Sequence, residues 1–285
     1  MMDPPKKKLL ITGAGGFIGT HLCETLNTQG IPFEIFSRQS DLWPERLDQL
    51  DLSAFLGVIH LAQPKVKQTN SWADLERDCI LPIRGLLKAI HKTNPPCLFV
   101  FVTSQSAKRD TSSKYGKMKW LAEQLLVESN LNYTILRPGL VFGKGDQGLF
   151  NQLRRLIKLS PIVPLIGLGH QQIQPVSLQI LVDAIIHVTK SPEQHFRAIY
   201  PIAFSPITFK EFLMQLAKLE KKQRLFIPIP AIFINFFLFF LELLPNPPLT
   251  RANLAGFLQT DIMCCEETWK KLEIDSKSKG IQNLI

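Results

Sequence analysis

The chain has 285 residues, 45% of them apolar, and is therefore long enough to bury a full hydrophobic core. Its formal charge of +9 favours an anionic partner, namely a phosphate-bearing cofactor, an acidic membrane surface or nucleic acid. The lysines and arginines lie in small separate groups without interleaved aromatic residues, so nucleic acid is not expected as a partner. Five cysteines without CxxC spacing and six scattered histidines predict no metal site, and the odd number of cysteines favours a reducing cytoplasm.

The first predicted elements are a buried strand, a glycine turn and a helix, in the stretch LLITGAGGFIGTHLCETL at residues 9–26. Three glycines are spaced three apart in such a turn: Gly13 permits the tight turn, Gly16 lets a pyrophosphate approach the backbone, and Gly19 lets the helix pack closely. The N-terminus of the helix adds unpaired N–H groups. The pattern predicts a dinucleotide site, and a purely structural turn is the alternative.

The second predicted strand, IPFEIFSR at residues 31–38, indicates which dinucleotide binds. An acidic residue at its end would accept the ribose hydroxyls of NAD, but the chain has Ser37 and Arg38 there. Because a guanidinium pairs well with a 2′-phosphate, NADP is favoured over NAD as the cofactor. An Arg38 that is merely solvated at the surface is the alternative interpretation.

Strands and helices continue to alternate as far as residue 143. The elements expected are, in chain order, a strand at 56–62, a helix at 73–93 with a proline inside it, an all-apolar strand at 97–104, a helix at 113–129 and a strand at 132–143. This alternation predicts an α/β protein with a doubly wound parallel sheet, the Rossmann architecture.

Beyond residue 143 the alternation is less regular. The elements expected are a helix at 148–159, a proline-rich loop or strand at 160–169, a helix at 178–191, a strand at 197–204 and a capped helix at 206–220. We therefore predict a Rossmann core at 1–143, to which 179–204 returns. A smaller, interleaved substrate- or partner-binding lobe would comprise 144–178 and 205–285, at the carboxyl edge of the sheet.

The stretch AIFINFFLFFLELL at residues 231–244 is unusually rich in aromatic residues. As a helix it would span roughly 21 Å, short of the roughly 30 Å hydrocarbon core, and Asn235 and Glu242 interrupt it. A transmembrane span is therefore not predicted. A buried helix is one interpretation, and an interfacial or partner-binding helix is the other.

Candidate catalytic residues occur in the motif YGKMK. Tyr115 and Lys119 are four apart on a predicted helix and so share a face, and Ser104 follows the strand that precedes this helix. A free phenol has a pKa near 10, so Tyr115 could act as an acid unshifted. To act as a base at neutral pH it would need a drop of about three units, much of which a nearby ammonium and a cationic nicotinamide can supply. A chance tyrosine–lysine pair is the alternative.

The glycine turn and the motifs HLA, VTSQS, YGKMK and ILRPGLVFG, in this order between residues 8 and 143, resemble the extended short-chain dehydrogenase/reductase group, the NAD-dependent epimerase/dehydratase family. The resemblance implies that Tyr115 is the catalytic acid/base, that Lys119 binds the nicotinamide ribose and tunes Tyr115, and that Ser104 orients the substrate. It also implies that 60–62 line the adenosine side and that Pro138 lies near the nicotinamide. With the turn and Arg38, the expected cofactor-binding residues are Gly13, Gly16, Phe17, Ile18, Gly19, Arg38, His60, Leu61, Ala62, Lys119 and Pro138.

Three stretches of the C-terminal part, at residues 141–176, 226–237 and 249–263, are similar to an atypical branch of that family. This branch contains the nucleotide-binding accessory subunit of respiratory complex I and free-standing bacterial relatives. In that branch NADPH is often held structurally. Sugar-nucleotide epimerases carry an arginine for the substrate diphosphate where this chain has QQIQ, and paired aspartates where it has Gln179 and Ile180. The position of a catalytic asparagine is taken by Asp78 or Cys79. These departures weaken the expectation of a nucleotide-sugar substrate.

Two functions are consistent with these residues. The leading hypothesis is an NADP(H)-dependent reductase or epimerase/dehydratase that transfers hydride to or from a small carbonyl or hydroxyl substrate, nucleotide sugars included, with Tyr115 moving the proton. The competing hypothesis is an NADPH-binding accessory or assembly protein without turnover. In that case residues 231–244 would contact a membrane periphery or a protein partner.

Overall fold

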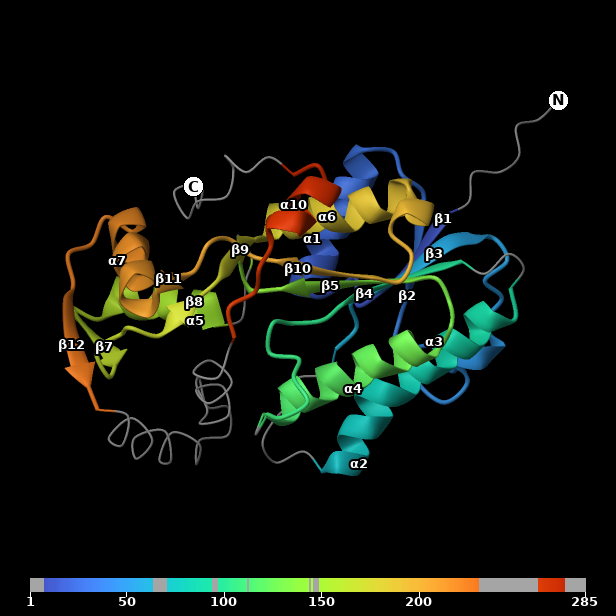
Figure 1. Cartoon of the computed structure of the whole chain (residues 1–285), viewed down its shortest axis with the longest axis horizontal. Helices are drawn as coiled ribbons and strands as arrows, with labels where there is room; N and C mark the ends of the chain where they lie inside the picture. The colour runs from blue at the N-terminus through green and yellow to red at the C-terminus, as the bar shows by residue number, and fades with distance from the viewer. Residues whose placement is uncertain are drawn as a thin grey trace.

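The computed structural model of the chain describes residues 8–63, 71–93, 97–111, 113–143, 145, 149–230 and 261–274. Its centre is a parallel six-stranded sheet with the strand order β10-β5-β4-β3-β1-β2 (Figure 1). The strands of this sheet are β1 (Lys8–Thr12), β2 (Phe33–Phe36), β3 (Phe55–His60), β4 (Leu98–Val102), β5 (Tyr133–Pro138) and β10 (Ala198–Ile202). The predicted doubly wound α/β fold is confirmed.

The strand order reverses at the pair β1 and β3. From β1 the chain moves outward to β2 on one side, whereas β3, β4, β5 and β10 follow one another on the other side. Parallel strands place their carboxyl ends at one edge of the sheet, and a crevice opens there at the point of reversal. Thr12 and His60, the last residues of β1 and β3, are register partners and lie at this edge.

Helices cover both faces of the sheet (Figure 1). The helices α1 (Phe17–Thr28) and α6 (Leu178–Lys190) belong to one hydrophobic cluster, and α3 (Leu81–His91) and α4 (Lys114–Glu128) to the other. All five residues of β4 are buried between them, as an all-apolar strand requires. Each large apolar side chain buried in this way contributes about 1.5–3 kcal/mol to folding.

The helix predicted at 73–93 differs from the expectation of one continuous element. The structure divides it into α2 (Trp72–Leu75), a π-helical turn η2 (Glu76–Ile80) and α3. The N–H of Leu81 donates to the carbonyl of Glu76, five residues back. Pro82 has no N–H to donate, and it lies in the first turn of α3, where no intrahelical donor is needed. The widened turn therefore replaces the continuous helix at the proline.

The remaining described elements lie outside the main sheet. They are η1 (Leu47–Gln49), η3 (Pro192–Gln194), α5 (Leu149–Leu159), α7 (Phe209–Leu219), α10 (Glu266–Lys271), and the strand pairs β6 (Leu140–Phe142) with β9 (Pro175–Ser177), β7 (Ile162–Ile166) with β12 (Leu225–Ile229), and β8 (Gln172–Ile173) with β11 (Ile207–Thr208). The stretch predicted as a loop or strand at 160–169 thus contains β7. The strand predicted at 197–204 joins the main sheet as β10, and α10 packs against it.

The segment 231–244, predicted as a buried or interfacial helix, lies outside the described residues. Of the helices that the structure does describe, none combines the length and the apolar character needed to cross a bilayer.

Candidate active site

The glycine turn joins β1 to α1 and has no room for a side chain at two positions. Gly13 has a φ of +76°, and a Cβ there would lie 2.5 Å from the backbone nitrogen of Ala62. A Cβ on Gly19 would lie 2.3 Å from the carbonyl oxygen of Gly13. Gly16 closes the turn by donating its N–H to the same oxygen at 3.0 Å. Only glycine fits the backbone at 13 and 19 without a shift of the turn.

The N-terminus of α1 follows this turn directly. Gly16 is its N-cap residue, and within this fully described helix no side chain caps the first turn and no acidic residue lies in it. Its N–H groups and the positive end of the helix dipole are therefore available to an anion. The close backbone and the uncapped helix fit the phosphates of a dinucleotide, which Gly16, Phe17 and Ile18 would hold.

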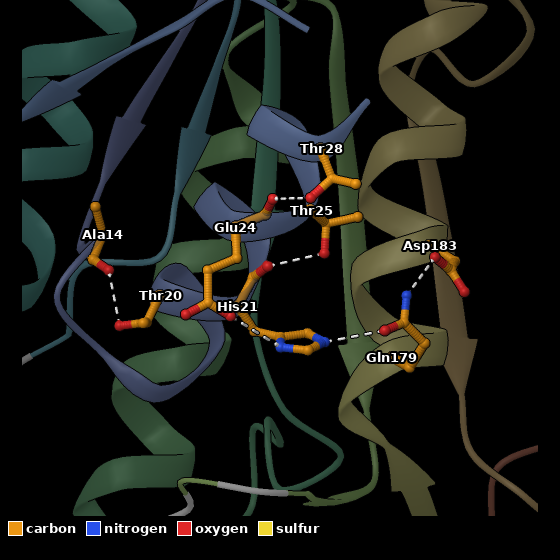
Figure 2. A network of polar contacts seen from close by, with 8 residues as sticks. All are labelled: Ala14, Thr20, His21, Glu24, Thr25, Thr28, Gln179 and Asp183. Carbon is orange, nitrogen blue, oxygen red and sulfur yellow. Dashed lines mark hydrogen bonds and ion pairs between the residues drawn. The ribbon is translucent and has the colours of Figure 1, made fainter. Parts of the chain in front are cut away.

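Figure 2 shows how α1 is held against α6. His21 Nε2 lies 3.0 Å from Gln179 Oε1, and Gln179 Nε2 donates to Asp183 at 2.8 Å. Thr20, in the first turn of α1, donates its hydroxyl hydrogen to the carbonyl of Ala14 in the glycine turn at 3.3 Å. Gln179, one of the residues that depart from the family pattern, thus links the two helices, and its amide is already used within the protein.

His60 lies under the glycine turn and is 1% exposed. Its Nδ1 is 2.8 Å from the hydroxyl of Thr12, and the backbone N–H of Leu61 donates to the carbonyl of Thr12 at 3.1 Å. Burial, with the charges of Lys119 and Arg38, lowers the pKa of His60 to about 3, so the imidazole is neutral at physiological pH. Residues 60–62, which were expected to line the cofactor, therefore pack directly against the start of the glycine turn.

Arg38 lies two residues beyond the end of β2 and is exposed. Its guanidinium carbon is 5.6 Å from the ring centroid of Trp43, a cation–π distance that orients the side chain. The charge of Arg38 contributes to the lowered pKa of His60, the last residue of β3. Trp43 is a residue that the sequence analysis did not single out.

The start of α4 brings the three predicted catalytic residues together. Ser113 caps the helix by accepting the N–H of Gly116 at 3.3 Å, and a Cβ on Gly116 would lie 2.4 Å from the carbonyl oxygen of Ser106. This close approach sets Tyr115 beside the loop that follows β4. The Tyr115 side chain interacts with Ser104, whose Oγ is 2.9 Å from Ser106 Oγ.

Lys119 lies one turn further along α4 and is 3% exposed. Its Nζ donates to the carbonyl of Val102 at 3.0 Å and lies 5.8 Å from the ring centroid of Tyr115. Tyr115 and Lys119 thus share one face of the helix, as their spacing predicts. The ammonium is held at the end of β4 and directed toward the phenol.

The two pKa shifts in this pair oppose the base role considered for Tyr115. Burial raises the pKa of Tyr115 to about 12, although 36% of its surface is exposed, and the interaction with Ser104 opposes the rise. Burial lowers the pKa of Lys119 to about 7, against the charges of Cys79 and Glu123. Lys119 is not among the groups that shift the pKa of Tyr115, so a lowering of the phenol pKa by the ammonium is not found. Tyr115 is protonated at neutral pH and suited to donate a proton.

Stability should depend on pH through Lys119. Its pKa is about 7 in the folded chain and near 10.5 in the unfolded chain, so between these values only the unfolded state binds the proton and stability rises with pH. We expect the free energy of unfolding of the wild type, minus that of Lys119→Met, to increase by about 2 kcal/mol from pH 7 to pH 9. Urea unfolding at each pH measures it. Lys117→Met, in the same helix, is the control, and a difference that stays flat with pH contradicts the prediction.

Of the two alternatives at the asparagine position, Cys79 is the one near the pair. Its thiol is 3% exposed and interacts electrostatically with Lys119 and Tyr115, and burial raises its pKa to about 11. Asp78 instead accepts a hydrogen bond from Arg77 at 2.9 Å at the surface. Both residues lie in the π-helical turn η2, whose geometry differs from that of an α-helix. Sequence spacing alone therefore could not decide which of the two faces Lys119.

A buried amide, missed by the sequence analysis, lies beside Ser104. Gln174, 3% exposed, accepts from Gln105 Nε2 at 2.8 Å and from the N–H of Met263 at 2.7 Å. It donates to the carbonyls of Met263 at 2.9 Å and Phe204 at 3.3 Å. Pro138, the last residue of β5, accepts the N–H of Gln105 at 2.8 Å. Gln105 and Gln174 lie inside the quoted motifs VTSQS and QQIQ, but nothing local indicates that they meet.

This arrangement defines a class of protein: a Rossmann fold with a dinucleotide-type glycine turn and a tyrosine–lysine–serine cluster at the same edge of the sheet. Residues 9–203 match the model of the NAD dependent epimerase/dehydratase family. The chain belongs to this family, which confirms the resemblance carried by its motifs.

Two curated relatives span most of the chain. A UDP-glucose 4-epimerase of Vibrio cholerae is 28% identical, with coverage of 93% of this chain and 90% of the relative. A mitochondrial protein of Dictyostelium discoideum, NADH dehydrogenase [ubiquinone] 1 alpha subcomplex subunit 9, is 25% identical, with coverage of 79% and 68%. Similarity thus extends to an enzyme and to a respiratory-complex subunit.

Solved structures share the fold. A dTDP-glucose 4,6-dehydratase from Bacillus anthracis in complex with NAD has a TM-score of 0.69 at 14% identity, covering 97% of this chain and 94% of that chain. The protein RMD from Pseudomonas aeruginosa complexed with NADPH has a TM-score of 0.61 at 17% identity, covering 79% and 88%. Structural neighbours therefore bind either nicotinamide dinucleotide.

Proposed function

We propose that the protein is an NADP(H)-dependent oxidoreductase or epimerase/dehydratase acting on a carbonyl or hydroxyl substrate, with nucleotide sugars as one candidate class. The observation that carries the proposal is the buried Lys119, whose Nζ lies 5.8 Å from the Tyr115 ring centroid and donates to Val102 at the end of β4, with Ser104 beside Tyr115. Residues 1–143 with 179–204 would hold the dinucleotide. The smaller lobe, 144–178 and 205–285, would hold the substrate or a partner.

The residues of the cluster have distinct parts in this chemistry. The nicotinamide, when bound, supplies the hydride acceptor or donor. Tyr115, whose pKa is about 12, is protonated at neutral pH and donates its proton to the alkoxide oxygen that develops in reduction. Ser104 donates a hydrogen bond to the same oxygen. Lys119, whose pKa of about 7 lets it hold a proton near neutrality, stabilises the phenolate that Tyr115 leaves behind.

The test of this function uses the absorbance of the nicotinamide. Fractions of a small-molecule extract from the source cell are added to the protein at saturating NADPH, and separately at saturating NADP⁺. The proposal predicts that one fraction changes the absorbance with wild type. The absence of a change with every fraction, while NADPH binds tightly, counts against an enzyme.

Arg38 supports NADP as the preferred cofactor, since an exposed guanidinium at the end of β2, over Trp43, would pair with a 2′-phosphate. We expect Arg38→Ala to weaken NADPH binding about 30-fold, which is the effect of losing one charge-assisted hydrogen bond. NADH binding should stay nearly unchanged. Fluorescence titration with both cofactors measures this. The control is Arg46→Ala, an exposed arginine that bonds Gln49. Equal loss of both cofactors contradicts the assignment.

The second candidate function is an NADPH-binding accessory or assembly protein without turnover. The similarity to the Dictyostelium respiratory-complex subunit favours it, and residues 231–244 would then supply the contact to a membrane periphery or a protein. Purification separates the two candidates. A detergent requirement or co-purification with membrane proteins favours the accessory role, whereas a monodisperse protein that turns over NADPH favours the enzyme.

A further inference from the structure

The smaller lobe ends in the parallel pair β7 and β12, at the end of the molecule remote from α3 (Figure 1). Leu225 pairs with Ile162, and Ile227 pairs with Pro164. Register partners in parallel strands point to the same side, and alternate residues point to opposite sides. These four residues therefore share one face of the pair.

This face is exposed, although its residues are apolar. Leu225 is 61% exposed, Ile162 47% and Ile227 36%, whereas Val163, on the opposite face, is fully buried. Leu159, three residues before Ile162, is 78% exposed. Leu159, Ile162, Leu225 and Ile227 are called the β7–β12 face below. Single exposed leucines are ordinary, but several together form a patch that normally meets another surface.

The surroundings of this face are strongly basic. The stretches 149–166 and 219–229 contain six lysines and arginines and one acidic residue, Glu220. The carboxylate of Glu220 is already shared by Arg154 and by Lys158, which lies 3.2 Å away. The remaining cations at this corner consequently have no acidic partner within these two stretches.

Three of these cations lie next to the apolar residues. Lys221 and Lys222 precede Leu225 by four and three residues, and Arg155 lies one helical turn before Leu159, on the same side of α5. All three are exposed, and none is ion-paired to any residue that the structure describes. Apolar side chains and unpaired positive charges thus occur at one corner.

We infer that the β7–β12 face docks on an anionic membrane surface, with its apolar residues in the interfacial layer and Arg155, Lys221 and Lys222 on lipid phosphates. Charge complementarity favours this occupant, because an anionic bilayer satisfies both the cations and the apolar side chains, and basic residues beside a membrane bind acidic lipids. The inference is independent of turnover and uses none of residues 231–244. An acidic protein surface or a second copy of the chain would be a different occupant.

Vesicle co-sedimentation of the full chain tests this docking. Vesicles of phosphatidylcholine with about one third phosphatidylglycerol, an anionic bilayer, are compared with pure phosphatidylcholine at low and high salt. Lys221→Gln/Lys222→Gln and Leu225→Gln are the test variants. Lys88→Gln/Lys190→Gln removes the same charge from two exposed lysines of α3 and α6 and is the matched control.

Wild type and control should sediment with anionic vesicles at low salt, and binding should fall as salt rises. Each test variant should lose at least tenfold in vesicle affinity. Equal binding by all variants overturns the inference, because the contact then lies elsewhere. A lack of vesicle binding combined with dimers that Leu225→Gln dissociates, seen by light scattering, overturns it in favour of a second copy.

Thermal unfolding of Leu225→Gln provides a check that does not involve lipid. Because Leu225 is 61% exposed, its replacement by a polar residue should change the melting temperature by only about a degree. A fall of several degrees would show that the protein covers this face with its own chain, which also overturns the inference.

Discussion

Tyr115→Phe is expected to lower kcat/KM about 10³-fold, the usual contribution of a positioned general acid, while the Kd for NADPH stays within about twofold of wild type. The substitution removes only the phenol oxygen, which interacts with Ser104. The alkoxide formed in reduction then has no proton donor with a matched position. Nicotinamide absorbance with the active extract fraction measures the loss, and fluorescence titration measures cofactor binding.

The chain offers a matched control in Tyr200 of β10, away from the Tyr115 cluster. The Tyr200 hydroxyl is 2.9 Å from Nδ1 of His195. Tyr200→Phe should leave kcat/KM unchanged and cost about 1 kcal/mol of stability, the value of one buried hydrogen bond. Full activity in Tyr115→Phe would rule out Tyr115 as the proton donor. If wild type and Tyr115→Phe bind NADPH equally and neither turns over, the accessory role replaces the enzyme.

Gly19→Ala should have the second large effect, on both stability and cofactor binding. Its Cβ would lie 2.3 Å from the carbonyl oxygen of Gly13, so the turn has to shift. We expect a loss of about 1–3 kcal/mol in the free energy of unfolding, as in overpacked cores, partly offset by the better helix propensity of alanine. A displaced turn should also weaken NADPH binding at least tenfold, by our estimate from lost phosphate contacts.

Gly15→Ala is the control for this prediction, because a Cβ at Gly15 would meet no atom within 4 Å. Its apo melting temperature should match wild type. Calorimetry of both variants without cofactor separates the effect on the fold from the effect on binding. A Gly19→Ala protein as stable as Gly15→Ala would show that the backbone of the turn adapts freely and that its close packing is not required.

Most of the fold follows from local patterns. The apolar run of β4 and the regular alternation of strands and helices predict a parallel sheet covered by helices on both faces. The structure has such a sheet. The π-helical turn before Pro82 was not predicted, because it results from competition between a proline and helix continuation over one turn. The two-residue pairing of β8 with β11 is also invisible in sequence, since strands this short carry no periodicity.

The candidate site likewise contains some residues that local sequence patterns indicate and others that they do not. Gly13, Gly19, Tyr115 and Lys119 were found because their spacing is local, within one turn or one helix. The roles assigned to them remain predictions. The upward shift of the Tyr115 pKa could not be predicted from local spacing, because it results from burial. Gln174 joins residues up to 89 positions apart, and no sequence pattern spans that distance.

The hydrogen bonds of the Gln174 amide also bear on the order in which parts of the fold assemble during synthesis. A nascent chain released as far as residue 260 would contain every strand of the main sheet, α1 and α4. It would lack the backbone of Met263, which donates one hydrogen bond to Gln174 and accepts another. The loop that carries Ser104 is tied to that amide through Gln105. During synthesis the main sheet can therefore assemble early, whereas the loop that carries Ser104 acquires this support only after Met263 has been made.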